Sequence, residues 1–192
     1  MTTSWNPRRT ALLMAHLQQG IIGRMTSDPA PLLTAAAFAL ATARGAGMVV
    51  VHARIAVIPG HSQVSSRNKM LAPLLKGGFM IEGSEDAMIH AAVAPSSGEV
   101  VVTNQRVGAF AATDLEQLFR ARQIEHLVLA GYATSGVILT TIRDAADRDY
   151  ELTVLSDAVA DNDSELHEVL IRKLFPRQAE VIDTAAFAAA VT

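Results

Sequence analysis

Residues 127–150 read LVLAGYATSGVILTTIRDAADRDY, and the fold class follows from this stretch. The apolar, partly β-branched run at 127–130 predicts a buried strand. From Thr134 or Ser135, either of which can cap a helix, the pattern changes to helical spacing that continues to Arg148. A strand followed directly by a helix is the repeating unit of parallel sheets that are covered by helices.

The same alternation extends over the rest of the chain. The predicted strands are 11–17, 48–54, 100–104, 127–130, 152–156 and 180–182. The predicted helices are 31–44, 115–122, 134–148, 164–175 and 185–191. We therefore predict the α/β class, as a Rossmann-like three-layer fold with a mostly parallel sheet of about six strands and helices on both faces.

Two helix starts carry explicit capping signals. Thr113 and Glu116 have the spacing of a capping box ahead of the helix at 115–122. Asp163 or Ser164 can cap the helix that runs to residue 175. These signals support the helix boundaries given above.

The chain has 192 residues, half of them hydrophobic, so we expect a single globular domain over residues 1–192. Residues 55–99 are different, because Pro-Gly, Gly-Gly and Ser-Ser pairs interrupt their apolar pattern. We interpret this stretch as an excursion from the sheet that is long enough to roof a pocket.

Composition excludes several classes of protein. No apolar run approaches the roughly 20 residues that cross a bilayer, and no cleavable signal pattern is present, so we expect a cytoplasmic protein without a membrane partner. The net charge of −3, the scattered Lys and Arg residues and the 5% aromatic content argue against a nucleic-acid partner. The absence of cysteine excludes disulfides, thiolate zinc sites and a cysteine nucleophile.

Neither a metal nor a cofactor is predicted. The six histidines are dispersed, and no His-x-x-x-His pair or adjacent carboxylate cluster accompanies them. His52 and His61 are the one pair that could share a metal. His126 and His167 are expected on the surface.

Polar residues gather where three predicted strands end. His16 and Gln18 lie at the end of the first strand, and Asn104 and Arg106 lie at the end of the third. Residues 131–137 follow the fourth strand and open a helix, whose backbone N–H groups can hold an anion. Ligands of doubly wound sheets bind outside the carboxyl ends of the strands, so these residues are candidates for a site. Arg106 is the candidate for binding a carboxylate, because a guanidinium forms a bidentate pair with it.

Each candidate also has a structural interpretation. His16 could be a hydrogen-bonded structural residue, and Asn104 and Arg106 could satisfy loop carbonyls. Ser135 lacks a surrounding Gly-x-Ser-x-Gly motif, so helix capping is favoured over a role as nucleophile.

The stretch at 127–150, with 152–158 after it, resembles the signature segment of the isochorismatase-like hydrolases. Residues 11–18 (ALLMAHLQ) resemble the first strand of that superfamily. Residues 106–110 (RVGAF) and 113–115 (TDL) resemble its third-strand exit and following helix. The resemblance spans nearly the whole chain in the right order, and it implies a homodimer or homotetramer with a small-molecule ligand.

The resemblance also implies that the chemistry has changed. Cysteine hydrolases of this superfamily use an aspartate at the end of the first strand, a lysine at the end of the third, and a cysteine at the start of the helix after the fourth. The resemblance assigns these positions to His16, Asn104 and Val137. Val137 cannot attack a carbonyl, so the covalent route is absent, and Asn104 has no charge with which to lower a neighbouring pKa. Isochorismatases proper use the aspartate as an acid without the cysteine, and an imidazolium at His16 with a pKa near roughly 6.5 could also donate a proton.

Further residues are expected to bind the substrate around these three positions. They are Gln18, Arg106, Phe110, Tyr132, Thr134, Ser135 and Gly136. The resemblance also implies a non-proline cis peptide bond at Ala133-Thr134 that aims backbone N–H groups into the pocket.

Three functions therefore stay open. The first is an enzyme without covalent catalysis, in which His16 is the general acid or base. The second is a catalytically inactive relative that acts as a small-molecule binding or assembly partner. The third, a structural protein without a ligand, is disfavoured by the polar strand ends. We expect a pocket for a small polar or carboxylate-bearing metabolite.

Overall fold

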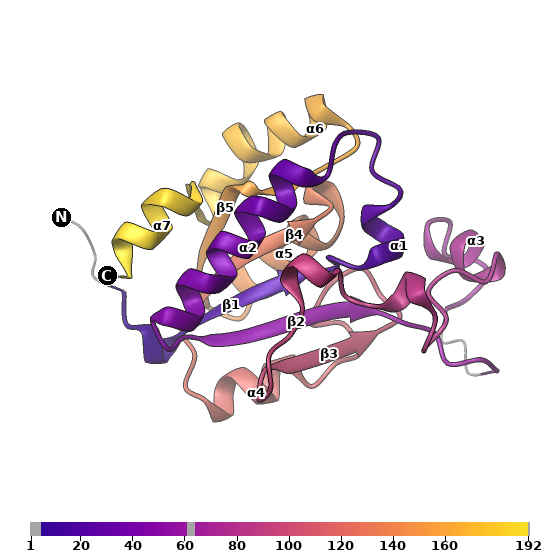
Figure 1. Cartoon of the computed structure of the whole chain (residues 1–192), viewed down its shortest axis with the longest axis horizontal. Helices are drawn as coiled ribbons and strands as arrows, with labels where there is room; N and C mark the ends of the chain where they lie inside the picture. Colours follow the sequence, from indigo (N-terminus) through magenta and orange to yellow (C-terminus); the bar gives the residue numbers. More distant parts are fainter. Residues whose placement is uncertain (1–4, 61–63, 192) are drawn as a thin grey trace.

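The computed structural model describes residues 5–60 and 64–191, which form one six-stranded sheet (Figure 1). The strands are β1 (Thr10–Ala15), β2 (Val49–Ile55), β3 (Val100–Asn104), β4 (His126–Tyr132), β5 (Glu151–Ala160) and β6 (Glu180–Ile182). All neighbouring strands are parallel, in the order β3-β2-β1-β4-β5-β6. The predicted α/β class is therefore confirmed.

Helices cover both faces of the sheet. The α-helices are α1 (Gln19–Ile22), α2 (Ala30–Gly45), α3 (Leu71–Lys76), α4 (Leu115–Ala121), α5 (Leu139–Ala146), α6 (Ser164–Val169) and α7 (Thr184–Ala190). The other helical segments, which are 3-10 or π turns, are η1 (Pro7–Arg9), η2 (Glu85–Ala87), η3 (Ala91–Val93), η4 (Thr134–Ile138), η5 (Leu170–Leu174) and η6 (Phe175–Arg177). No helix in the described part of the chain is long and apolar enough to span a membrane.

The apolar pattern of the strands explains the two helical layers. Along β1, Leu12 and Met14 belong to the buried cluster that includes α2 and α7. Leu13 and Ala15 belong to the cluster on the other face, which includes α4 and α5. Successive strand residues point to opposite faces, so a strand that is covered on both sides is apolar at every position.

The strand order reverses at β1, which lies between β2 and β4. The chain leaves β1 toward α2 on one face of the sheet and leaves β4 toward α5 on the other face. Doubly wound sheets bind their ligands outside the carboxyl ends of the strands at such a switch point.

The excursion predicted at 55–99 leaves the sheet between β2 and β3 and contains α3, η2 and η3. Figure 1 shows α3 beyond the carboxyl end of β2. A small apolar cluster holds the excursion there, and it includes Ile55, Leu71, Phe79, Met80 and Ala87. The excursion thus lies at the end of the sheet that carries the candidate residues.

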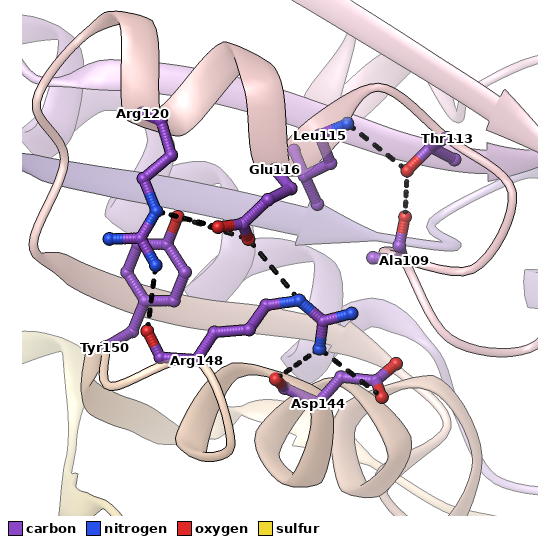
Figure 2. Close-up of polar contacts among 8 residues, drawn as sticks. All are labelled: Ala109, Thr113, Leu115, Glu116, Arg120, Asp144, Arg148 and Tyr150. Carbon is purple, nitrogen blue, oxygen red and sulfur yellow. Dashed lines mark hydrogen bonds and ion pairs between the residues drawn. The ribbon is translucent and has the colours of Figure 1, made fainter.

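The capping box predicted at Thr113 and Glu116 does not form, because Asp114 is the N-cap residue of α4 and its side chain makes no capping hydrogen bond. Thr113 Oγ1 accepts a 3.4 Å hydrogen bond from the backbone N–H of Leu115. The Glu116 carboxylate, however, lies 2.7 Å from Arg120 Nε and 3.4 Å from Arg148 Nε (Figure 2). A charge-assisted hydrogen bond from Arg120 and an ion pair with Arg148 are together stronger than one hydrogen bond from a backbone N–H, so Glu116 does not turn back to the cap.

Candidate functional site

His16 lies immediately after β1 and leaves the sheet in the left-handed region, with φ of 55°. Its backbone N–H still donates to the Ala53 carbonyl at 2.9 Å. The residue is only 4% exposed, and Nε2 has no hydrogen-bond partner within the described ranges 5–60 and 64–191. Burial lowers the pKa of His16 to about 4, so the imidazole is neutral at pH 7.

Asn104 is the last residue of β3 and is 7% exposed. Its Nδ2 donates to the carbonyl oxygens of Gly108 at 2.8 Å and Ala111 at 2.9 Å, which holds the loop before α4. Its Oδ1 is buried without a partner in the part of the chain that the structure describes. An unpaired buried acceptor costs about 1–3 kcal/mol, so a ligand group that pairs with it would recover this free energy.

Val137 lies in η4, at the start of the helix that follows β4, and is 1% exposed. It belongs to the same buried cluster as Ala109 and Phe110 of the loop that Asn104 holds. The Ala109 N–H also donates to Thr141 Oγ1 of α5 at 3.3 Å. This loop therefore connects the end of β3 to the start of α5 at the edge of the sheet where His16 also lies.

Gln18 is fully buried, and both ends of its amide are paired. Its Nε2 donates to the carbonyl oxygens of Ile55 at 2.7 Å and Ala87 at 2.9 Å. Its Oε1 accepts from the Ile55 N–H at 2.8 Å. The Gln18 side chain therefore connects the end of β1 to β2, through Ile55, and to the excursion at 55–99, through Ala87.

The turn after β4 contains a non-proline cis peptide bond at Tyr132-Ala133. The sequence placed this bond at Ala133-Thr134, so that prediction is wrong by one residue, although the bond lies in the same turn. Tyr132 is 7% exposed and contributes to the apolar cluster beneath α2. Its burial, followed by the nearby charge of Asp161, raises the pKa of the Tyr132 hydroxyl.

The sequence predicted that the side chain of Thr134 or Ser135 caps the helix after β4. That prediction is wrong, because neither side chain makes a capping hydrogen bond. The Ser135 N–H instead donates to Asp161 Oδ2 at 2.7 Å. Thr134 is fully buried, and its Oγ1 lies 2.9 Å from His167 Nδ1. Asp161 follows β5, the neighbour of β4, so its carboxylate reaches the first turn of the helix. The sequence suggests capping by Asp161 but does not identify the Ser135 N–H as its partner, nor Thr134 as the partner of His167, because both contacts depend on strand order.

Gly136 is half-buried, and its N–H donates to the Ala133 carbonyl at 3.0 Å. Its backbone departs from helical geometry, with φ of −97° and ψ of −105°. The kink at Gly136 separates the first turn from the regular helix α5. A side chain at this position would make only ordinary contacts, to Val107 and Ala133.

Phe110 and Arg106 lie in the loop after β3. Phe110 is 6% exposed, and its ring stacks on Tyr150 with centroids 6.1 Å apart. The Arg148 guanidinium lies 4.8 Å from the centroid of the Phe110 ring, and Figure 2 shows Arg148 between Glu116 and Asp144. Phe110 is thus part of the packed face beneath α4 and α5.

Arg106 is half-buried, and its NH1 donates to the Gln105 carbonyl at 2.9 Å.

Two other histidines are buried away from this edge. His52 Nε2 lies 2.9 Å from Glu99 Oε2, and the proposed metal partner His61 lies outside the described residues. His126 is 8% exposed and Trp5 packs against it edge-on, with ring centroids 4.5 Å apart, so its predicted surface position is wrong. Within residues 5–60 and 64–191, no group of three or more His, Asp or Glu could hold a metal.

Known proteins resemble this chain over nearly its whole length. The family described as Isochorismatase domain matches residues 10–186. Maleamate amidohydrolase of Pseudomonas putida is 35% identical over 183 residues, which cover 91% of this chain and 83% of that protein. An isochorismatase family protein from Burkholderia thailandensis has a TM-score of 0.85 at 26% identity, covering 98% of this chain and 97% of its own. A cysteine hydrolase from Pseudomonas syringae pv. phaseolicola has a TM-score of 0.87 at 25% identity, and the match covers 98% of this chain and 95% of that protein's chain.

Proposed function

The chain belongs to the isochorismatase family, and from this premise we propose that it binds a small polar or carboxylate-bearing metabolite without covalent catalysis. The proposed site lies at the carboxyl ends of β1, β3 and β4. It contains His16, Asn104 and Val137 at the positions that the resemblance assigns to aspartate, lysine and cysteine. A valine has no lone pair with which to attack a carbonyl, so no acyl-enzyme can form there.

The observation that carries the proposal is that two of the four unpaired buried side-chain atoms in the described residues, His16 Nε2 and Asn104 Oδ1, lie at the carboxyl ends of β1 and β3. A site that had lost its ligand as well as its chemistry would be free to fill with apolar side chains. Buried polar atoms are nearly always hydrogen-bonded in folded proteins, and unpaired ones need an explanation. A bound polar molecule explains both atoms at once.

The identity of a relative supports a ligand of small size. Maleamate amidohydrolase is 35% identical to this chain, and its name specifies maleamate, a small molecule with one carboxamide and one carboxylate. In the proposed site Arg106 would pair with a ligand carboxylate, because a guanidinium offers a planar pair of donors. Thr134, Ser135 and Gly136, in the turn after β4, would line the site, although the N–H groups of Ser135 and Gly136 are already paired within the protein.

Hydrolysis with His16 as a general base is the second candidate. One observation favours it: the neutral imidazole has an unpaired Nε2 that can accept a proton from water. The same burial that keeps His16 neutral lowers its pKa to about 4, which makes it a weak base and leaves little imidazolium at pH 7. Binding without turnover is therefore the better supported function.

Ligand binding and turnover can be tested together on the wild type, His16→Asn and His126→Asn. Asn tolerates the left-handed backbone at His16, and His126 is an equally buried histidine at the other end of the sheet, so its variant is the matched control. Maleamate, an N-carbamoyl amino acid and an enol-pyruvyl ether would be screened by thermal shift and by product release. We expect one probe to raise the Tm of wild type and control but not of His16→Asn, with no product. Product formation that requires His16 would establish the second candidate, and no shift with any probe would overturn binding.

A further inference from the structure

A pocket lies at the amino ends of β4, β5 and β6, away from the site proposed above. Its volume is about 490 Å³, and its lining includes Trp5, His126 and Thr153. His126 is the first residue of β4, and β5 begins at Glu151, which also lines the pocket. In Figure 1 this end of the sheet is the one opposite α3. The pocket is therefore separate from the candidate residues at the carboxyl ends of the strands.

The register of the sheet places four of the pocket residues on one face. His126 pairs with Glu151, and Thr153 pairs with Glu180 of β6. Paired residues of neighbouring strands point to the same face, and so do residues two apart on one strand. The contact of 2.9 Å between His126 Nε2 and Thr153 Oγ1 agrees with this arrangement. Glu151 and Glu180 thus extend over the same surface from neighbouring strands, with their Cα atoms roughly 8 Å apart.

His126 supplies a hydrogen-bonding atom to the wall of this pocket. The residue is only 8% exposed, and the Trp5 ring packs edge-on against it. Its Nε2 is occupied by Thr153, whereas Nδ1 has no hydrogen-bond partner within residues 5–60 and 64–191. Nδ1 is not closed off from solvent, so a molecule in the pocket can reach it. When Nε2 donates to Thr153 Oγ1, Nδ1 is an acceptor that a ligand N–H group can satisfy.

Three charged side chains line the same pocket. Glu151 and Glu180 carry carboxylates, and Arg177 lies three residues before Glu180, at the end of η6. All three residues are exposed, and no ion pair joins the guanidinium to either carboxylate in the part of the chain that the structure describes. The pocket therefore presents two negative charges and one positive charge that a ligand can pair with.

The ligand that complements this lining carries two cationic groups and one carboxylate. A carboxylate pairs with the planar donors of the Arg177 guanidinium. Ammonium groups pair with the two glutamates, and an alkyl chain that joins them packs on the face or edge of the Trp5 ring. An amino acid with a cationic side chain has all of these groups in one small molecule.

We propose that this pocket binds a free amino acid with a cationic side chain. The α-carboxylate pairs with Arg177, and the two cationic groups lie at Glu151 and Glu180. The alkyl stem packs on Trp5, and one ammonium group donates to His126 Nδ1. This site is independent of the proposed function, because the two sites lie at opposite ends of the sheet.

Three related ligands test the assignment of each charge. L-Lysine carries both ammonium groups and the carboxylate, L-norleucine lacks only the side-chain ammonium, and cadaverine lacks only the carboxylate. Isothermal titration at pH 7 and low salt should give lysine a Kd about two- to fivefold below that of either relative. This factor is the gain expected from one exposed ion pair, and added salt should reduce it.

Variants then tie each advantage to its side chain. Arg177→Gln should remove the advantage of lysine over cadaverine, and the double variant Glu151→Gln, Glu180→Gln should remove its advantage over norleucine. All three positions are exposed, so the Tm without ligand should change little. Glu165→Gln is the matched control: Glu165 is an exposed carboxylate of α6 outside the pocket, and its variant should keep both advantages.

The outcomes also separate this site from the one at the carboxyl ends. His16→Asn should bind lysine as the wild type does, and a loss of lysine binding in that variant would overturn the inference. Lysine that binds no more tightly than norleucine or cadaverine would overturn it as well, and so would advantages that persist in the pocket variants. If none of the three ligands binds with a Kd below about 10 mM, this pocket is not a site for them, while the proposed function is unaffected.

Discussion

The carbonyl oxygen of Ala15 lies 2.1 Å from the point where a Cβ on Gly131 would stand. The two residues are partners in the register of β1 and β4, and Gly131 has φ of +146°. Only a residue without a side chain fits between these backbones. Ala15 ends β1 and immediately precedes His16, so this close approach lies directly beside the candidate residue.

Gly131→Ala should destabilise the protein by about 3 kcal/mol or more, because the new methyl group meets rigid backbone and the backbone angle is unfavourable. The free energy of unfolding in urea measures the effect. Gly45→Ala is the matched control: nothing lies within 4 Å of a Cβ there, and Gly45 ends a helix. The control should be neutral or gain about 0.5–1 kcal/mol. Equal stabilities of the two variants would contradict the importance of the close approach.

Restoring aspartate, lysine and cysteine tests the assignment of the three altered positions. The triple variant His16→Asp, Asn104→Lys, Val137→Cys should contain a thiol whose pKa lies at least about one unit below the ordinary 8.5, because a lysine ammonium nearby stabilises the thiolate. The chain has no other cysteine, so the ultraviolet absorbance of the thiolate reports this group alone. Val137→Cys by itself should titrate at or above the ordinary value, since its surroundings are apolar. A triple variant that titrates like the single one would refute the assignment.

Acid should weaken the fold through its buried histidines. Burial lowers the pKa values of His16 and His126 to about 4, against about 6.5 in an unfolded chain. Between these pH values the unfolded state binds more protons, so stability is complete above pH 6.5 and falls as the pH drops toward 4. Each histidine should account for up to about 3 kcal/mol of that loss.

Urea unfolding at pH 7 and at pH 4.5 measures this dependence. His16→Asn and His126→Asn should each lose less stability between the two conditions than the wild type does. Carboxylates that titrate in the same range affect all three proteins alike, so the difference isolates the imidazole. An unchanged pH dependence in either variant would mean that the histidine concerned is protonated as readily in the fold as outside it.

Glu99→Gln should cost about 1–3 kcal/mol. The carboxylate accepts from Arg44 Nε at 2.7 Å and from the Ser96 N–H at 2.9 Å, and it lies 2.9 Å from His52 Nε2. The hydrogen bond from Arg44 is the largest cause that lowers the pKa of Glu99 to about 2, so the group is ionised throughout the neutral range. Glu125→Gln removes an exposed partner of Arg9 and should change stability by less than about 0.5 kcal/mol. If both variants lost a similar free energy of unfolding, the contacts of Glu99 with Arg44, Ser96 and His52 would be no more stabilising than an exposed ion pair.

Much of the fold could be predicted from the sequence because both faces of this sheet are covered. A strand such as β1 is then apolar at nearly every position, which makes it conspicuous, and all six strands begin within one residue of the predicted start. The end of β5 was less visible: the strand continues to Ala160, beyond the predicted 156, because polar Ser156 and Asp157 interrupt the apolar run without ending it.

The partners of the site residues could not be predicted, since they come from distant parts of the chain. The amide of Gln18 was expected to meet a ligand, but the order of the strands brings the Ile55 backbone to it. The burial of His126 depends on Trp5, which approaches from the start of the chain. Sequence identifies which residues gather at the strand ends, whereas hydrogen bonding decides which atoms stay unpaired.

The contacts of Gln18 have a consequence for the geometry of β1. One side-chain amide both donates to and accepts from the main chain of Ile55, as the peptide group of a neighbouring strand would. It therefore acts as a final rung of the ladder between β1 and β2 after the β1 main chain has turned away. The Gln18 side chain makes the hydrogen bonds to Ile55 that the main chain of a longer β1 would have made. The main chain can therefore leave the sheet at His16, with its left-handed φ, while the Ile55 peptide groups stay paired.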